Sequence, residues 1–599
     1  MTTFGFQRSR GELQEEAWGP LQRALHRWVI AHGGSPLLAS TAAWASLVDA
    51  RADAALALAG PDAGLQGMPA LGDDEIESLR SEQMVGDGSN DSPTAFVIDA
   101  QSRFYLWRNF SRERRIGKGL RELRRVSSND AAVIDEAALA MLFGDAASGD
   151  DSAQRAAVRQ LSHRRFGVLT GGPGTGKTTT VLRMLLMAQR HRQQAGLAPA
   201  RIAIAATTGK AAQRLLASLQ DGKRALQSRL PGSDTSTDSW YAHLTQLPAS
   251  DALTLHSLLG YRPYDGRFTR NRDLPLDADI VVVDEASMLD LSLLDALLQA
   301  LPDTAQLFLV GDADQLTSIG TGSVLLDLVA AMEGSNDLVR LRHGFRAQSP
   351  QLPRLLTAAR MGDVDAFNSA FDGIDAARHR VVSKAQLDVR LHAWAERLAG
   401  LSLLREGRAV NEADALAALD TLASQQLLCA LREGGYGAVH ANAAIERILR
   451  LQWQQPAEAV WYPGRAVMVT RNDYASKLFN GDVGICLADA EGDLRVWFEA
   501  AAATSDVDGA RRARAFTPAA LPAHESAFAI TVHKSQGSEY ADVALLLPPN
   551  PQHQVLTRQL VYTGLSRARK RIELWSGEGA LATALATPVR RIGGLREGC

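Results

Sequence analysis

The sequence has few cysteines, no long apolar run and no overall excess of basic residues. Its three cysteines, Cys429, Cys486 and Cys599, are far apart and lack the spacing of metal ligands, which argues against a disulfide framework or a zinc site. No apolar run reaches the roughly 18 residues that a transmembrane helix needs, and residues 1–16 lack the apolar core of a signal peptide. We therefore expect a protein that stays in the cytoplasm, away from membranes.

The net charge of −3 does not exclude a nucleic-acid partner, because a DNA-binding surface can be local. One local candidate is the stretch from 108 to 125, which holds eight basic and two acidic residues. Three interpretations of this stretch stay open: a solvated helix face, a contact with a partner protein, or a contact with DNA. The chain of 599 residues is long enough for about three to five domains of roughly 100–200 residues each.

Residues 1–125 predict a mainly helical domain. Apolar residues recur at helical spacing around Trp28 and Trp44, and residues 61–93 are richer in Gly, Asp and Ser, which is typical of loops around a short helix. No catalytic set of residues occurs in this region. We therefore expect it to dock on a partner protein, and the alternative is a self-contained helical domain that packs on the rest of the chain.

Residues 126–350 have a different pattern, in which short apolar runs end in turn residues and are followed by helical segments. The runs lie at 166–172, 201–208, 279–287 and 305–312. Strands that alternate with helices predict a parallel sheet covered on both faces. A stretch rich in Gly, Ser, Asp and Pro interrupts this order and predicts a small insert at about 218–275, with a hairpin turn at Asp265-Gly266.

A second α/β region is expected over residues 351–599, with buried strands near 528–537, 542–549 and 571–577. Within it, residues at about 461–520 have short apolar strands joined by the turns Asn480-Gly481 and Glu491-Gly492. Turns of this composition favour tight hairpins. We therefore predict a small all-β insert in the second α/β region.

One loop has the composition of a phosphate-binding site. Residues 171–178 read GGPGTGKT, which fits the pattern G-x-x-x-x-G-K-[ST] between a predicted strand and a predicted helix. Glycines let backbone N–H groups turn towards phosphates, and the start of the helix adds positive potential. Lys177 is expected to bind the β- and γ-phosphates of ATP, and Thr178 to bind Mg²⁺ through its hydroxyl. The predicted ATP-binding residues here are Gly171, Gly172, Pro173, Gly174, Thr175, Gly176, Lys177, Thr178 and Thr179.

Two further strand ends carry acidic or amide side chains. Asp284 and Glu285 follow the apolar run 280–283, and the ends of such strands are where parallel sheets bind ligands. Asp284 is expected to hold Mg²⁺, and Glu285 to orient or deprotonate the attacking water. The alternative for this pair is a helix cap. Gln315, in the sequence GDADQ, is placed to sense the γ-phosphate.

In their order along the chain and in their residues, these motifs and several others resemble those of the RecD family of superfamily 1 helicases, the alpha subunits of exodeoxyribonuclease V. The resemblance covers residues from about 150 to 577. It implies two RecA-like motor domains with parallel sheets, an N-terminal helical domain and an SH3-like all-β insert in the second motor domain. Thr207 departs from the family, which usually has proline before Thr-Gly-Lys. The segments that carry the resemblance are GGPGTGKTTT, TTGKAAQRL, TLHSLLG, VVVDEASMLD, LVGDADQLTSIGTGSVL, HGFRAQSP, PGRAVMVTRNDY, FNGDVGI, AITVHKSQGSEY and LVYTGLSRARK.

The resemblance also implies roles for individual residues. Gln154 would read adenine, Glu539 would contact ribose, and Gly537 belongs to the same nucleotide-binding set. Arg346 and Arg567 would reach the γ-phosphate from the second motor domain. A further set would touch single-stranded DNA or couple it to ATP, although a histidine such as His256 could instead be a packed core residue: Thr208, Lys210, His256, Thr531 and His533.

The implied activity is an ATP- and Mg²⁺-dependent DNA helicase that moves 5′ to 3′. The leading hypothesis is a subunit of a RecBCD-type helicase-nuclease that acts on double-strand DNA ends in recombinational repair. Its partners would be a RecB-like helicase-nuclease, which carries the nuclease, and a RecC-like scaffold, in a heterotrimer. Alternatives are a stand-alone RecD-like helicase and a structural clamp with an idle ATP site. The short region before the motor favours the subunit, and the complete ATP motifs argue against the idle clamp.

Overall fold

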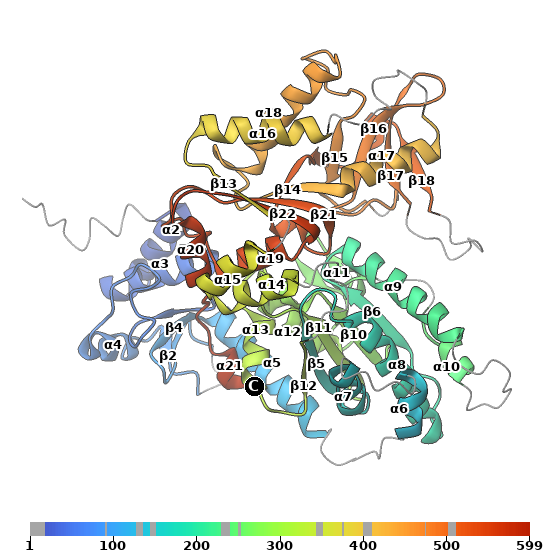
Figure 1. Cartoon of the computed structure of the whole chain (residues 1–599). Helices are drawn as coiled ribbons and strands as arrows, with labels where there is room; N and C mark the ends of the chain where they lie inside the picture. Colours follow the sequence, from blue (N-terminus) through green and yellow to red (C-terminus); the bar gives the residue numbers. More distant parts are fainter. Residues whose placement is uncertain are drawn as a thin grey trace, which may run out of the picture.

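Two parallel sheets, each covered by helices, make up most of the chain, and the N-terminal region (blue in Figure 1) lies beside the first. No helix among the described residues is long and apolar enough to cross a membrane. The computed structural model describes residues 18–89, 93–126, 136–143, 151–228, 240–248, 253–342, 351–373, 376–398, 410–473, 475–500 and 511–599.

The first sheet has the strand order β12-β5-β11-β10-β6-β7, and every neighbouring pair is parallel. This confirms the parallel sheet that the alternation of strands and helices predicts. The sheet and the helices around it are called the first α/β domain below. Its strands are β5 (Phe166–Gly171), β6 (Ile202–Ala206), β7 (Leu253–Thr254), β10 (Ile280–Asp284), β11 (Gln306–Gly311) and β12 (Leu338–Leu341).

Helices cover both faces of this sheet because successive strand residues point to opposite sides. Val281 and Val283 of β10 join one core, whereas Ile280 and Val282 join the other. The helices of the first α/β domain are α6 (Glu136–Phe143), α7 (Ser152–Leu161), α8 (Lys177–Gln194), α9 (Gly209–Gln227), α10 (Trp240–Thr245), α11 (Leu255–Leu258), η2 (Ala286–Met288), α12 (Leu291–Ala300) and α13 (Val324–Ala331), and they are joined by α5 (Trp107–Val126), which belongs to the N-terminal region.

The predicted insert at 218–275 begins too early, since residues 218–227 complete helix α9. Its Gly222 is a packing residue rather than a break. A Cβ atom added there would lie 2.7 Å from Leu182 Cδ2, so the glycine lets α9 pack closely on α8. The predicted hairpin is present as β8 (Tyr261–Arg262) and β9 (Arg267–Phe268), and Gly266 turns it with a φ of 68°.

The second sheet is also parallel, with the order β13-β22-β21-β14-β20, and its surroundings are called the second α/β domain. Its strands are β13 (Ala376–Arg380), β14 (Gln425–Cys429), β20 (Ala529–Thr531), β21 (Tyr540–Leu546) and β22 (Ala568–Ser576). Its helices are α14 (Gln351–Met361), α15 (Val364–Phe371), α16 (Lys384–Leu398), α17 (Glu412–Ser424), α18 (Ala438–Gln452), η5 (His533–Ser535), α19 (Arg558–Leu565) and α20 (Ala580–Ala586).

An antiparallel sheet of order β18-β17-β16-β15-β19 is inserted in the second α/β domain. Gly481 and Gly492 turn its chain with φ values of 95° and 87°, at the two turns that the sequence predicts. A resemblance of this sheet to an SH3 fold stays a prediction. The elements are β15 (Ala466–Val469), β16 (Val483–Ala488), β17 (Leu494–Glu499), β18 (Ala513–Phe516), η4 (Pro518–Ala520) and β19 (His524–Ser526).

The N-terminal region contains helices and, in addition, a four-stranded sheet of order β1-β4-β3-β2 that the sequence does not predict. These strands have two to four residues, too few to give a clear alternation of apolar and polar side chains. The elements are α2 (Pro20–Ala31), α3 (Pro36–Ala50), β1 (Ala55–Ala57), α4 (Asp73–Arg80), β2 (Val85–Gly86), β3 (Phe96–Ile98) and β4 (Arg103–Leu106).

The basic stretch 108–125 lies in α5 and packs on the first α/β domain. Arg115 donates hydrogen bonds to both carboxylate oxygens of Asp295 in α12, at 3.0 and 2.6 Å. Arg124 donates to Asp337 at 2.8 Å. At least two of its basic side chains therefore hold the N-terminal region on the first α/β domain, a use that none of the three sequence interpretations includes.

The C-terminal segment returns from the second α/β domain to the N-terminal region, where it ends in α21 (Leu595–Gly598) beside α5 (Figure 1). The Ile592 carbonyl accepts a hydrogen bond from the Ala54 amide at 2.9 Å. Arg591 donates to the Gly322 carbonyl of the first α/β domain at 2.7 Å. The chain end thus ties all three parts of the molecule together.

Candidate functional site

A cleft between the two α/β domains gathers most of the predicted site. The carboxyl ends of β5, β10 and β11 meet at one edge of the first sheet, as parallel strands require. Residues of the second α/β domain close the cleft from the opposite side. The predicted residues that line it are Pro173, Gly174, Thr175, Gly176, Lys177, Thr178, Thr179, Asp284, Glu285, Gln315, Glu539 and Arg567.

The glycine-rich loop between β5 and α8 has the shape that a phosphate-binding loop needs. Gly174 and Gly176 have φ values of 72° and 81°, which side chains rarely adopt. The Lys177 ammonium donates hydrogen bonds to the carbonyls of Gly171 and Gly172, at 2.7 and 3.0 Å. The loop therefore curls around the amine at the start of α8, where backbone N–H groups favour an anion.

Gln154 lies beside this loop, and it is not among the residues that line the cleft. Its side chain is 4% exposed. The amide nitrogen donates to the Thr175 carbonyl at 3.2 Å, and the amide oxygen accepts from Arg183 at 3.0 Å. Gln154 thus supports the loop from within α7, and its role in reading adenine stays a prediction.

Asp284 and Glu285 lie at the end of β10, opposite the loop. Burial, together with the neighbouring Glu285 carboxylate, raises the pKa of Asp284 above its usual value, and the Lys177 ammonium opposes this shift. Glu285 has a φ of 52°, which is strained for a residue with a side chain. The Thr178 hydroxyl and the Asp284 carboxylate line the same cleft and are oxygen donors of the kind that Mg²⁺ prefers, so the residues present fit this ion.

The second α/β domain contributes Arg567 from the segment after α19. This residue is 3% exposed and donates to the Ser566 hydroxyl at 2.9 Å and to the Thr563 carbonyl at 3.2 Å. Its guanidinium is therefore held in place beside the cleft that contains Lys177 and Glu285. Arg346, the second predicted arginine, lies outside the described residues.

Glu539 bridges the two domains. Its carboxylate accepts hydrogen bonds from Arg214 of α9 and, at 3.0 Å, from Arg569 of β22. Burial opposes its charge, but the two guanidinium groups outweigh burial and hold its pKa at about 2. The carbonyl of Gly537, the other predicted residue of this segment, accepts from Arg214 at 3.1 Å.

Arg214 is a site residue that the sequence analysis misses. It lines the cleft with three other residues of α9 that share a helical spacing, namely Ala211, Leu215 and Ser218. This spacing is visible in the sequence once the start of α9 is known. The hydrogen bonds from Arg214 to the second α/β domain are not, because they join residues that are far apart in the chain.

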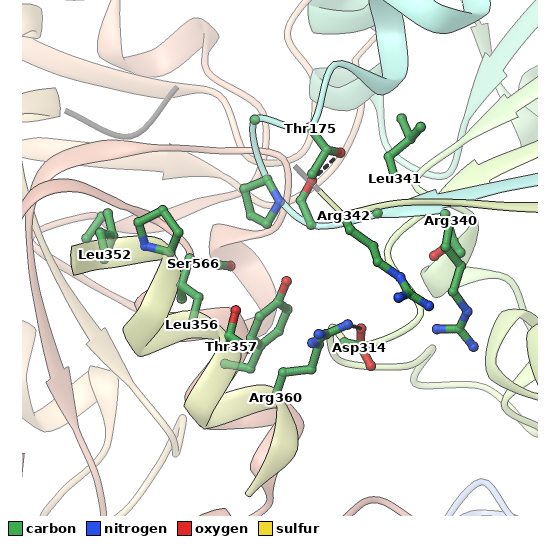
Figure 2. A pocket seen from close by; sticks show the side chains of 18 of the residues that line it. Thr175, Asp314, Arg340, Leu341, Arg342, Leu352, Leu356, Thr357, Arg360 and Ser566 are labelled. Carbon is green, nitrogen blue, oxygen red and sulfur yellow. Dashed lines mark hydrogen bonds and ion pairs between the residues drawn. The ribbon is translucent and has the colours of Figure 1, made fainter. Parts of the chain in front are cut away.

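A second pocket adjoins the first and shares Pro173, Gly174, Thr175 and Glu539 with it. Figure 2 shows the guanidinium groups of this pocket near Asp314, while leucines of α14 lie on the other side. An apolar wall and several hydrogen-bond donors next to the phosphate loop can hold the base and sugar of a nucleotide. The labelled residues that form these walls are Arg340, Arg342, Arg360, Leu352 and Leu356.

Two of the predicted DNA contacts, Thr208 and Lys210, lie at the start of α9. Thr208 caps the helix by accepting a hydrogen bond from the Ala211 amide at 3.2 Å. The all-β insert packs here, since a Cβ atom added at Gly209 would lie 2.8 Å from the Phe479 side chain. Burial lowers the pKa of Lys210, which the Asp482 carboxylate of the insert opposes.

The other predicted DNA contacts occupy different elements. His256 is exposed rather than part of a buried core, although its ring lies 5.2 Å from the Tyr261 ring and partial burial lowers its pKa. Thr531 ends β20, and its hydroxyl accepts from the Lys534 amide at 3.4 Å. His533 is half-buried, and burial lowers its pKa. Their contacts with DNA stay predictions.

Two family models match the chain. The AAA domain matches residues 154–321, and the UvrD-like helicase C-terminal domain matches residues 526–574. The chain is 36% identical over 451 residues to "RecBCD enzyme subunit RecD" of Mycobacterium tuberculosis strain H37Rv, covering 75% of this chain and 73% of that protein. The protein of the same name from Haemophilus influenzae is 32% identical, with 74% and 71% covered. The "ATP-dependent RecD2 DNA helicase" of Deinococcus radiodurans is 29% identical, with 84% and 59% covered.

Proposed function

This chain belongs to the RecD family, and from that premise we propose that it is an ATP-driven 5′-to-3′ DNA helicase that works as a subunit of a RecBCD-type helicase-nuclease. The observation that carries the ATP chemistry is the composition of the cleft. Lys177 and Glu285 come from the first α/β domain, and Arg567 and Glu539 come from the second. A nucleotide bound there would contact both domains at once.

Each group in the cleft has a task that its chemistry suits. Lys177 holds the β- and γ-phosphates, while Thr178 and Asp284 would hold Mg²⁺, which would supply positive charge at the phosphates. Glu285 accepts a proton from the attacking water. Arg567 stabilises the charge that develops on the transferred phosphoryl group.

Hydrolysis can then drive motion between the domains. Arg567 reaches the γ-phosphate only in the closed cleft, so loss of that phosphate removes one attraction that holds the cleft shut. Thr208 and Lys210 lie in the first α/β domain, whereas Thr531 and His533 lie in the second. If both sets grip single-stranded DNA through its phosphates, opening and closing the cleft moves one grip relative to the other.

The subunit hypothesis also specifies partners. They are a RecB-like helicase-nuclease and a RecC-like scaffold that together act with this chain on double-strand DNA ends in the cytoplasm. In support, helix α2 exposes Leu21 (66%) and Trp28 (44%), two large apolar side chains seven residues apart on one face of the helix, which a partner protein could cover. A stand-alone helicase is the second candidate, favoured by the likeness to the RecD2 helicase over 84% of this chain.

Two measurements test the proposal. Steady-state ATP hydrolysis by the purified chain should rise on addition of single-stranded oligonucleotide, and the Lys177→Gln variant should show no such activity. Purification of the chain from its natural host should recover two large partners in equal amounts. A rate of ATP hydrolysis that does not change when DNA is added would contradict the proposed motor function. A chain that unwinds long duplexes without partners would favour the stand-alone helicase.

A further inference from the structure

The loop after β11 belongs to the first α/β domain in sequence, yet the second α/β domain holds it. The Tyr562 hydroxyl of α19 donates a hydrogen bond to Asp312 Oδ2 at 3.0 Å. The Leu316 amide donates to the Thr563 hydroxyl at 2.8 Å, and the Gln536 amide nitrogen donates to the Leu316 carbonyl at 3.2 Å. All of these side chains are buried. The loop is therefore fixed from across the cleft at three points.

The Asp312 carboxylate connects these hydrogen bonds from the second α/β domain to the Gln315 side chain. Its Oδ2 atom accepts from Tyr562 and also from the Gln315 amide nitrogen, at 3.0 Å. A carboxylate oxygen can only accept, so the Gln315 amide has to turn its nitrogen to Asp312 and its oxygen away. Within the part of the chain that the structure describes, this oxygen is buried and has no hydrogen-bond partner.

The Gln315 carbonyl oxygen can only accept a hydrogen bond, so its partner in the cleft has to be a donor. Gln315 lines the cleft beside Lys177 and Glu285. A γ-phosphate oxygen is itself an acceptor and cannot pair with the Gln315 carbonyl, whereas the O–H of the attacking water can. The arrangement therefore suits the Gln315 oxygen to orient the water, while the second N–H of the same amide can donate to a phosphate oxygen.

Tyr562 is well placed to depend on closure of the cleft. Burial and the Asp312 carboxylate raise the pKa of its hydroxyl well above the usual value, so the hydroxyl stays a donor. A Cβ atom added at Gly172 of the phosphate loop would lie 3.0 Å from this hydroxyl. Its bond to Asp312 thus crosses the domain interface next to the loop that holds the nucleotide.

We propose that Tyr562 is a positioning residue: its hydroxyl, through Asp312, fixes the orientation in which Gln315 presents its carbonyl oxygen to the attacking water. This role rests on the proposed ATP-driven function. It makes the second α/β domain set the geometry of a group on the first, so that hydrolysis is fast only when the cleft is closed.

The Tyr562→Phe variant removes the hydroxyl and keeps the ring. We expect the kcat of DNA-stimulated ATP hydrolysis to fall about tenfold, which corresponds to about 1.4 kcal/mol in the barrier, while the KM for ATP changes by less than about twofold. The matched control is Tyr462→Phe. Tyr462 is also buried, but it packs under the Arg450 guanidinium at 4.3 Å, away from the cleft. This variant should keep wild-type turnover.

A double variant separates positioning from general damage. If Tyr562 acts through Gln315, the change Tyr562→Phe should have no further effect on kcat in a Gln315→Ala background. The hydrogen bond from the Leu316 amide to the Thr563 hydroxyl gives an independent test. Thr563→Val removes the acceptor for the Leu316 amide and should also lower kcat, and Thr563→Ser, which keeps the hydroxyl, should restore it.

The outcomes are distinguishable. Wild-type hydrolysis that responds to DNA, together with a Tyr562→Phe variant of unchanged kcat, would overturn the positioning role and leave the proposed function standing. A rise in KM at constant kcat, or losses that multiply in the double variant, would also overturn it. Wild-type protein that does not respond to DNA would overturn both the positioning role and the function on which it rests.

Discussion

Replacing Glu539 with glutamine should loosen the contact between the two α/β domains while keeping a hydrogen-bond acceptor in place. A pKa of about 2, against an ordinary value of 4.5, means that the surroundings of Glu539, where Arg214 and Arg569 outweigh burial, stabilise its charged form by about 3 kcal/mol net. The Arg569 side chain is 59% exposed, so solvent screens part of this interaction. We therefore expect Glu539→Gln to cost about 2 kcal/mol.

The sign of the pH dependence follows from the lowered pKa. A carboxyl group whose pKa is lower in the folded protein than in the unfolded chain stabilises the fold above the unfolded value. The contribution of Glu539 should be complete above about pH 5.5 and decline as the pH falls from about 4.5 towards 2. The difference in stability between wild type and Glu539→Gln should therefore shrink on acidification.

Calorimetric melting between about pH 3 and 8 measures this difference across the range in which it should decline. For a domain of about 250 residues, about 2 kcal/mol corresponds to a shift in Tm of roughly 4 °C near pH 7. Glu578→Gln is the matched control, because its ion pair with Arg380 is largely exposed and should contribute little. A Glu539→Gln variant that melts like the wild type at pH 7, or a difference that grows in acid, would refute the reasoning.

Three other predictions follow from the cleft and from α2. Lys177→Gln should abolish DNA-stimulated ATP hydrolysis, whereas Glu285→Gln should bind a fluorescent nucleotide normally and hydrolyse ATP very slowly; near-normal turnover would remove Glu285 from the chemistry. Arg567→Ala should lower kcat about 10³-fold or more with little change in KM, and an effect on KM alone would show that Arg567 only binds ATP. Leu21→Glu combined with Trp28→Glu should leave hydrolysis intact and prevent co-purification with partner subunits, so a normal complex would place the docking surface elsewhere.

Features encoded by adjacent residues are those that the sequence predicts well. The loop at 171–178 and the strand that ends at Asp284 are recognisable because a short apolar run, a turn and a set of polar residues follow each other directly. The same holds for the glycine turns at Gly481 and Gly492, since their positive φ values depend on local geometry. Such patterns give the parallel sheets and one side of the cleft.

Contacts between distant segments leave no local pattern. Arg214 and Glu539 are 325 positions apart, and Asp312 and Tyr562 are 250 positions apart. In the sequence, nothing next to any of these residues distinguishes it from an ordinary polar side chain. Their pairing depends on how the two α/β domains face each other, which the sequence does not display.

In the N-terminal region, the sequence likewise does not show which residues pair with a run of basic side chains. The basic residues of α5 form a dense local run, which predicts a surface for solvent, protein or DNA. The structure pairs Arg115 with Asp295, which lies 180 positions away. A charge run therefore predicts an electrostatic partner, and only the fold identifies that partner as the first α/β domain.

The most direct test of the central claim is strand separation on two short duplexes of one sequence, which differ in whether the strand that the motor would follow carries its single-stranded tail at the 5′ end or at the 3′ end. The chain, alone or with its partners' motor disabled, should unwind the 5′-tailed duplex when ATP and Mg²⁺ are present, and Lys177→Gln should unwind neither. Unwinding of only the 3′-tailed duplex, or equal unwinding by Lys177→Gln, would contradict an ATP-driven 5′-to-3′ motor.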